Sequence, residues 1–104
     1  MKFSVDTDTW TITFADGRTV SWFEDEGFRI LSDAWLAASW QRKYSYQFTW
    51  FGRPIIQLPH DILLMQELIV RLRPTLIIET GIAHGGSAVL HASLLSMIHG
   101  GVNA

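Results

Sequence analysis

One short stretch of the chain holds the residues whose types and spacing could do chemistry. Residues 79–87 read Glu-Thr-Gly-Ile-Ala-His-Gly-Gly-Ser, after the apolar run Leu76-Ile77-Ile78 and before the apolar run that begins at Ala88. This order is typical of a buried parallel strand, a glycine-rich turn and a helix whose first N–H groups face a ligand. The turn is therefore the candidate cofactor site.

The spacing of the glycines separates the cofactors that such a turn could hold. A phosphate-binding P-loop needs a lysine directly before its Ser or Thr, but Gly86 stands there before Ser87. A dinucleotide fingerprint has one residue between its first two glycines, whereas three residues separate Gly81 from Gly85. The turn is therefore a poor fit to nucleoside triphosphates, NAD and FAD.

S-adenosylmethionine suits this spacing better, because it has no pyrophosphate to cradle. Its amino-acid part can lie against the bare backbone of the turn, and a carboxylate such as Glu79 can meet its ammonium group directly or through water. The alternative is that the glycines only form a tight turn between a strand and a helix, with Glu79 capping a neighbouring group. The turn alone leaves both interpretations open.

Regular elements must position this turn. Two β-rich segments, Thr9–Phe14 and Thr19–Phe23, flank Asp16-Gly17 and predict a hairpin. A helix is expected from the acidic residues 24–26 to about Gln41. One face of that helix is expected to hold Phe28, Leu31, Trp35 and Ala38. Aromatic residues alternate over residues 44–50, which predicts an extended segment.

The second half of the chain predicts the strand and the two helices around it. A helix opens at Pro59 and stops before Pro74, and Thr75–Thr80 is expected as a buried strand. The last helix is expected from Ser87 to about Ile98, with Gly100-Gly101 ending it. One side of the last helix is expected to hold Ala88, His91, Ala92, Leu95 and Ile98.

Composition excludes several classes of protein. The chain has 104 residues and a net charge of −2, which argues against a nucleic-acid binder with a basic face. It has no cysteine, so disulfides, a thiolate nucleophile and thiolate metal sites are excluded. No apolar run approaches the roughly 20 residues of a membrane span, and no leader peptide is recognisable at the N-terminus. We expect a cytoplasmic protein.

The remaining polar residues form no second site. His60, His91 and His99 have no metal-ligand spacing and are expected at helix surfaces or caps, so no metal site is predicted. His84 is expected to contact a cofactor through its backbone more readily than through its ring. The aromatic residues between Trp35 and Phe51 favour core packing over a substrate pocket or an oligomer face.

A longer pattern resembles a known family, the cephalosporin hydroxylase / rhamnosyl O-methyltransferase family. The resemblance covers roughly residues 35–99, and residues 1–30 do not add to it. Four motifs carry it: Tyr44–Asp61, Gln66–Ile69, Arg73-Pro74, and Ile77–Gly81 followed by Gly85-Gly86-Ser87.

The resemblance implies an α/β chain with an incomplete Rossmann-like fold of the class I methyltransferase type, preceded by a β-hairpin and helix. Residues 1–34 would be the N-terminal extension, and residues 35–104 the first part of a domain that binds S-adenosylmethionine. The residues that carry over to the cofactor loop by position are Glu79, Gly81, His84, Gly85, Gly86 and Ser87. The family's second strand, acidic metal ligands and substrate pocket would lie past Ala104, so a divalent metal is expected only with those parts.

Two functions follow as hypotheses. The first is the N-terminal fragment of a methyltransferase or cephalosporin hydroxylase-like enzyme, inactive alone and with its catalytic residues unidentified. The full-length family implies a small substrate such as a sugar, a lipid-linked glycoside or a β-lactam. The alternative is a non-catalytic module that assembles with a partner chain. In both cases the strand would have unpaired edges, so we expect an oligomer or a complementing chain.

Overall fold

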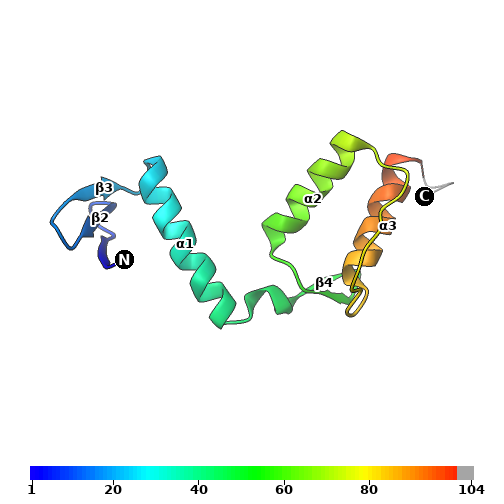
Figure 1. Ribbon diagram of the computed structural model, residues 1–104, viewed down its shortest axis with the longest axis horizontal. Coiled ribbons are helices and arrows are strands. Elements are labelled where there is room, and N and C mark those ends of the chain that lie inside the picture. Colours follow the sequence, from blue (N-terminus) through cyan, green and yellow to red (C-terminus); the bar gives the residue numbers. More distant parts are fainter. Residues whose placement is uncertain (101–104) are drawn as a thin grey trace. The chain divides into compact units, whose positions relative to one another are not determined.

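The computed structural model describes residues 1–100 and has a mixed α/β architecture. The chain divides into two compact units, Met1–Arg42 and Lys43–Ala104. The boundary expected after residue 34 falls inside helix α1 (Asp25–Gln41), which continues without a break to the end of the first unit (Figure 1). Each unit has its own small core.

The first unit contains a three-stranded antiparallel sheet in the order β1-β2-β3. Strands β2 (Thr11–Phe14) and β3 (Thr19–Ser21) form the predicted hairpin, and Gly17 in their turn has the positive φ, +87°, that glycine adopts readily. Strand β1 (Phe3–Asp6) pairs with β2 and was not predicted. The Asp6 carboxylate accepts the backbone N–H groups of Asp8 and Thr9, which fixes the β1–β2 turn.

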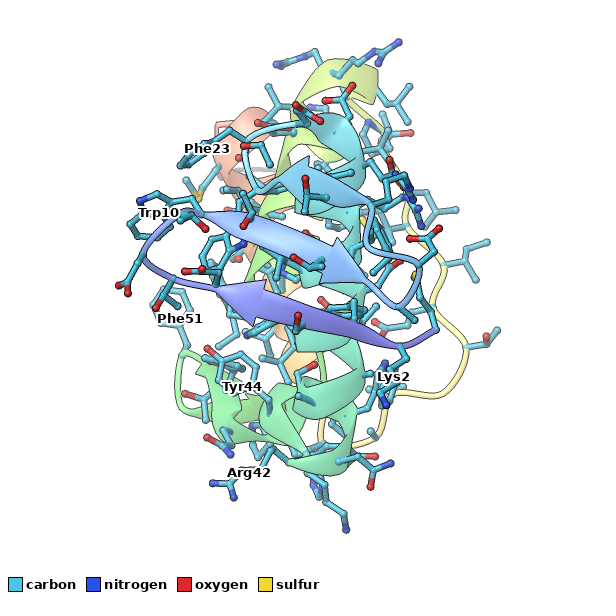
Figure 2. The ribbon with its side chains drawn as sticks, turned by 90° about the vertical axis from the view of Figure 1, so that its left-hand side faces the viewer. Lys2, Trp10, Phe23, Arg42, Tyr44 and Phe51 are labelled. Atoms are coloured by element: carbon cyan, nitrogen blue, oxygen red, sulfur yellow. The ribbon has the colours of Figure 1, made fainter. Side chains whose placement is uncertain are left out.

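Helix α1 packs on this sheet through Ile30, which meets Ile12 and Val20 in the core. Figure 2 shows α1 behind the three strands, with Trp10 and Phe23 at the same end of the sheet, where their ring centroids are 6.2 Å apart. The helix was predicted correctly, but its inner face only in part, since Leu31 packs against the core whereas Phe28 and Trp35 do not. Phe28 is 70% exposed and Trp35 is 47% exposed.

Gly27 explains which face of α1 turns inward. A Cβ atom at this position would lie 2.8 Å from the carbonyl carbon of Ser21, so the helix approaches β3 more closely than a side chain would allow. That close approach directs Gly27 and Ile30 toward the sheet and leaves Phe28 on the outside.

The second unit begins with a turn of 3₁₀-helix, η1 (Tyr44–Gln47). A short hairpin follows, with β4 (Phe48–Trp50) antiparallel to β5 (Arg53–Ile55). The expectation of an extended segment over residues 44–50 is therefore wrong for its first half. In this 3₁₀ turn Tyr44 is half-buried and Tyr46 is exposed. A 3₁₀ turn can therefore place alternating aromatic side chains on opposite sides, as a strand does.

Two helices complete the second unit. Helix α2 (Pro59–Leu72) begins with a proline and ends before Pro74, as predicted, with Arg73 as its C-cap. Helix α3 (Gly86–Ile98) begins one residue before the predicted start. The core of the unit is formed by Ile55, Ile69, Leu90 and Leu94. Among the residues expected on the inner side of α3, Ile98 packs against this core whereas Ala92 is exposed. Gly100 has φ of +78°, and the predicted Gly101 cap lies outside the described residues.

The expected buried strand Thr75–Thr80 is not a buried strand in the structure. Within residues 1–100 it has no strand partner, and Leu76 and Ile78 are 71% and 82% exposed. A strand is buried only where neighbours cover both of its faces, and here one side chain, Ile77, packs on the core. The segment runs back beside α3 toward the hairpin (Figure 1), with a hydrogen bond of 2.8 Å between His99 Nε2 and the carbonyl oxygen of Pro74.

Candidate cofactor-binding turn

The turn before α3 depends on left-handed backbone conformations. Gly81 and Gly85 have φ of +80° and +84°, and Ala83 between them has φ of +48°. The Gly85 N–H donates to the carbonyl oxygen of Ile82 at 2.8 Å, and Gly85 is the residue that precedes the first turn of α3. Glycine adopts this conformation without steric cost, so the sequence forms the turn at these two positions.

Gly86 has a different role from Gly85. A Cβ atom on Gly86 would lie 2.7 Å from the carbonyl carbon of Pro54 and 2.9 Å from Cα of Ile55. A Cβ atom on Gly85 would make only ordinary contacts, the nearest at 3.6 Å from Arg53. Gly86 therefore lets the start of α3 pack directly against β5, while Gly85 supplies the backbone turn.

Glu79 and Ser87, both expected at the site, are in direct contact. The Ser87 hydroxyl donates a hydrogen bond to Oε1 of Glu79. The other oxygen, Oε2, lies 3.4 Å from Nδ1 of His91, and these side chains are 22% and 13% exposed. Sequence reasoning placed His91 at a helix surface or cap and missed this contact. The sequence spacing could have predicted it, because Ser87 and His91 are four residues apart and so lie on one face of the helix.

His84 is exposed, and its carbonyl oxygen accepts a hydrogen bond of 3.0 Å from Nη1 of Arg53. The described contact of His84 is thus through the backbone. Arg53 is the first residue of β5, so this hydrogen bond connects the turn with the β4–β5 hairpin. Sequence reasoning had not connected Arg53 with the turn, which lies far along the chain.

A pocket of about 190 Å³ lies between the turn and the segment that begins at β5. Four of the expected site residues line it: Glu79, Gly81, Gly86 and Ser87. His84 and Gly85 do not line it. The other lining residues are Pro54, Ile55, Ile56, Gln57, Ile82 and Ala83. The pocket thus combines apolar side chains with one carboxylate, one hydroxyl and the amide of Gln57, but it is smaller than the roughly 300 Å³ at which small-molecule pockets begin.

A second hollow, about 270 Å³, lies on the first unit between β1 and β2. It is larger, but Lys2 is the only charged residue in its lining, and no expected site residue belongs to it. The carboxylate and hydroxyl groups in its lining therefore make the smaller pocket at the turn the better candidate for a ligand site. Within the described residues, no three His, Asp or Glu side chains come together as they would around a metal ion.

Comparison with known families assigns a family to the second unit. Residues 42–103 match the family described as rhamnosyl O-methyltransferase/CmcI, over more than half of the chain. The chain belongs to this family. The match confirms the resemblance and includes every residue of the turn, whereas residues 1–41 lie outside it. Neither a curated protein nor a solved structure matches the chain.

In the part of the chain from residue 1 to residue 100, no helix is long and apolar enough to cross a membrane.

Proposed function

We propose that the second unit binds S-adenosylmethionine at the turn before α3, as part of a methyltransferase with a Rossmann-like fold. The observation that carries the proposal is a carboxylate, Glu79, held by Ser87 at the wall of a pocket lined by Gly81 and Gly86. Family membership supports it independently, since methyl transfer is part of the family's description.

The chemistry of the pocket matches the amino-acid end of this cofactor. The ligand carries an ammonium group, and Glu79 offers an anion beside the Ser87 hydroxyl. The wall formed by Ile55, Ile56 and Ile82 suits apolar parts of the ligand. Because the pocket is small, it would enclose only part of the cofactor, whereas tight small-molecule sites enclose 70–90% of a ligand. We therefore expect weak binding by this chain, if measured alone.

The family's description also suggests the methyl acceptor. It names O-methyl transfer to a rhamnosyl group, so we infer a sugar hydroxyl as the acceptor class. Within the described residues 1–100, no second carboxylate joins Glu79 and His91 in a cluster, and the titratable side chain that contacts Glu79 is His91, at 3.4 Å.

A titration with S-adenosylmethionine, followed by backbone amide NMR, tests the proposal at weak affinity. We expect shifts of the N–H signals of Gly81, Gly86 and Ser87, and smaller shifts in Glu79→Gln because the anion is lost. Glu67→Gln is the matched control, since it makes the same change of charge on the exposed side of α2. Unchanged spectra at millimolar ligand, or equal shifts in Glu79→Gln and wild type, would contradict the proposal.

A second candidate function is a non-catalytic module that binds a partner chain. The exposed side chains of Leu76 and Ile78, on a segment with no strand partner within residues 1–100, favour it. The NMR titration separates the two functions, because a module without a cofactor site would show no ligand-dependent shift at the turn.

A further inference from the structure

His91 is a largely buried histidine that belongs to neither the turn motif nor the lining of the pocket. It lies on α3, one turn after Ser87, and its side chain is 13% exposed. Within residues 1–100 neither ring nitrogen has a hydrogen-bond partner of good geometry, and the same holds for Oε2 of Glu79. Buried polar atoms left without partners are costly, so three such atoms in one place call for an explanation.

The surroundings of His91 leave Glu79 as its partner. The elements packed against α3 are β4, β5 and α2. On β4, Trp50 donates to Ser93, and on β5, Arg53 donates to the carbonyl oxygen of His84. On α2, the charged side chains are exposed, and Arg73 after it donates to the carbonyl oxygen of Ile98 at the far end of α3. Among the described residues, the ion-pair contact of His91 is with Glu79, at 3.4 Å.

We propose that His91 is a positioning residue that holds the Glu79 carboxylate in place by donating from Nδ1 to Oε2. Ser87 already donates to Oε1, and a single hydrogen bond leaves a carboxylate free to turn about its last torsion, which has a broad energy profile. A second donor on the other oxygen fixes the plane of the group. His91 does not line the pocket, so it acts through Glu79 and does not touch the ligand. This inference rests on the proposed function only for the identity of that ligand.

The tautomer of the His91 ring tests the contact without any ligand. A neutral imidazole carries its proton on one nitrogen, and a strong acceptor beside Nδ1 selects the Nδ1–H form. We expect the ring ¹⁵N shifts of the wild-type chain above pH 8 to show His91 as Nδ1–H. In Glu79→Leu, which removes the acceptor, His91 should lose this preference, while the exposed His60 keeps the same tautomer in both proteins. A wild-type His91 protonated on Nε2 would overturn the proposal, whether or not the variant folds.

Two substitutions of His91 then test its effect on the pocket. His91→Asn keeps an amide donor near the position of Nδ1, whereas His91→Leu keeps an apolar bulk and removes the donor. In the titration with S-adenosylmethionine, we expect His91→Leu to weaken binding about tenfold or more, as for a lost hydrogen bond to a charged group, and His91→Asn to recover most of it. Equal weakening in both variants would mean that His91 is a packing residue and would overturn the positioning role. Absence of binding by the wild-type chain would overturn the proposed function, while the ring spectra would still decide the contact with Glu79.

Discussion

At the scale of single residues, the two adjacent glycines at the start of α3 have different structural roles. Gly85 supplies a left-handed backbone, and Gly86 supplies room for β5. In an open helix, Gly→Ala stabilises by about 1 kcal/mol, because alanine loses less backbone freedom on folding. At Gly86 the added methyl group meets the backbone of Pro54, which cannot move away as a flexible side chain would.

We therefore expect Gly86→Ala to lower the free energy of unfolding by about 1–3 kcal/mol, the range for overpacked sites. Urea unfolding followed by circular dichroism measures it. Gly52→Ala is the comparison in the same unit, because Gly52 has φ of +78° but open space around it, so its cost comes from the backbone alone. A Gly86→Ala variant as stable as the wild type would mean that α3 does not pack on β5 as described.

The residue scale also shows what the sequence could predict at the site. Spacing along the chain predicted Glu79 and Ser87 as candidates, because both belong to the turn motif itself, and the structure brings their side chains into contact. It missed Arg53 and His91, whose roles depend on tertiary contacts. Arg53 is separated from His84 by 31 positions, and no local pattern reports which carbonyl a distant arginine reaches.

At the scale of elements, Arg18 connects the β2–β3 turn with the first turn of α1. Its guanidinium makes two hydrogen bonds to the Glu26 carboxylate, at 3.0 and 3.1 Å, and lies 4.0 Å from the centre of the Phe14 ring. The hydrogen bonds from Arg18 hold the pKa of Glu26 below its ordinary value of 4.5. Both groups are exposed, so the contribution is small and falls at high salt.

The pH dependence of this link has a definite sign. Because the pKa of Glu26 is lower in the folded chain than in the unfolded chain, the stabilisation is present above the ordinary value of 4.5 and is lost as the pH falls through the folded pKa. We expect Glu26→Gln to reduce the free energy of unfolding at pH 7 and to change it less and less as the pH falls through the folded pKa of Glu26. Urea unfolding at pH 7 and at the lowest pH at which the wild-type chain stays folded measures it. Glu24→Gln, with the same change of charge, should leave the difference between the two pH values closer to that of the wild type.

Elements with strong local signals were predictable, and elements defined by partners were not. The apolar periodicity and proline at Pro59 predicted α2, and Asp16-Gly17 predicted the hairpin. Strand β1 was missed, because four residues that include two polar ones become a strand only through pairing with β2. Thr75–Thr80 shows the converse case. Its apolar sequence is typical of a buried strand, yet strand neighbours are lacking within residues 1–100.

At the scale of the whole molecule, the chain consists of two small units, each with a few buried apolar residues. Many large apolar side chains remain exposed, and three lie close together in the sequence: Leu76, Ile78 and Ile82. Unpaired backbone groups on an extended segment and exposed apolar side chains both favour association with another chain. The family match includes this segment, whereas the N-terminal unit lies outside it.

We therefore expect the chain to self-associate at high concentration through Thr75–Thr80. Light scattering coupled to size-exclusion chromatography should give a mass above 11.8 kDa that rises with concentration. The double variant Leu76→Lys/Ile78→Lys should shift the chain toward the monomer, because lysines at an edge repel one another and must be desolvated on pairing. Leu63→Lys/Leu64→Lys is the matched control, since it adds the same charge at exposed leucines on α2 and should leave the association nearly unchanged. A wild-type chain that stays monomeric and melts cooperatively at every concentration would mean that the exposed segment is compatible with a self-sufficient fold.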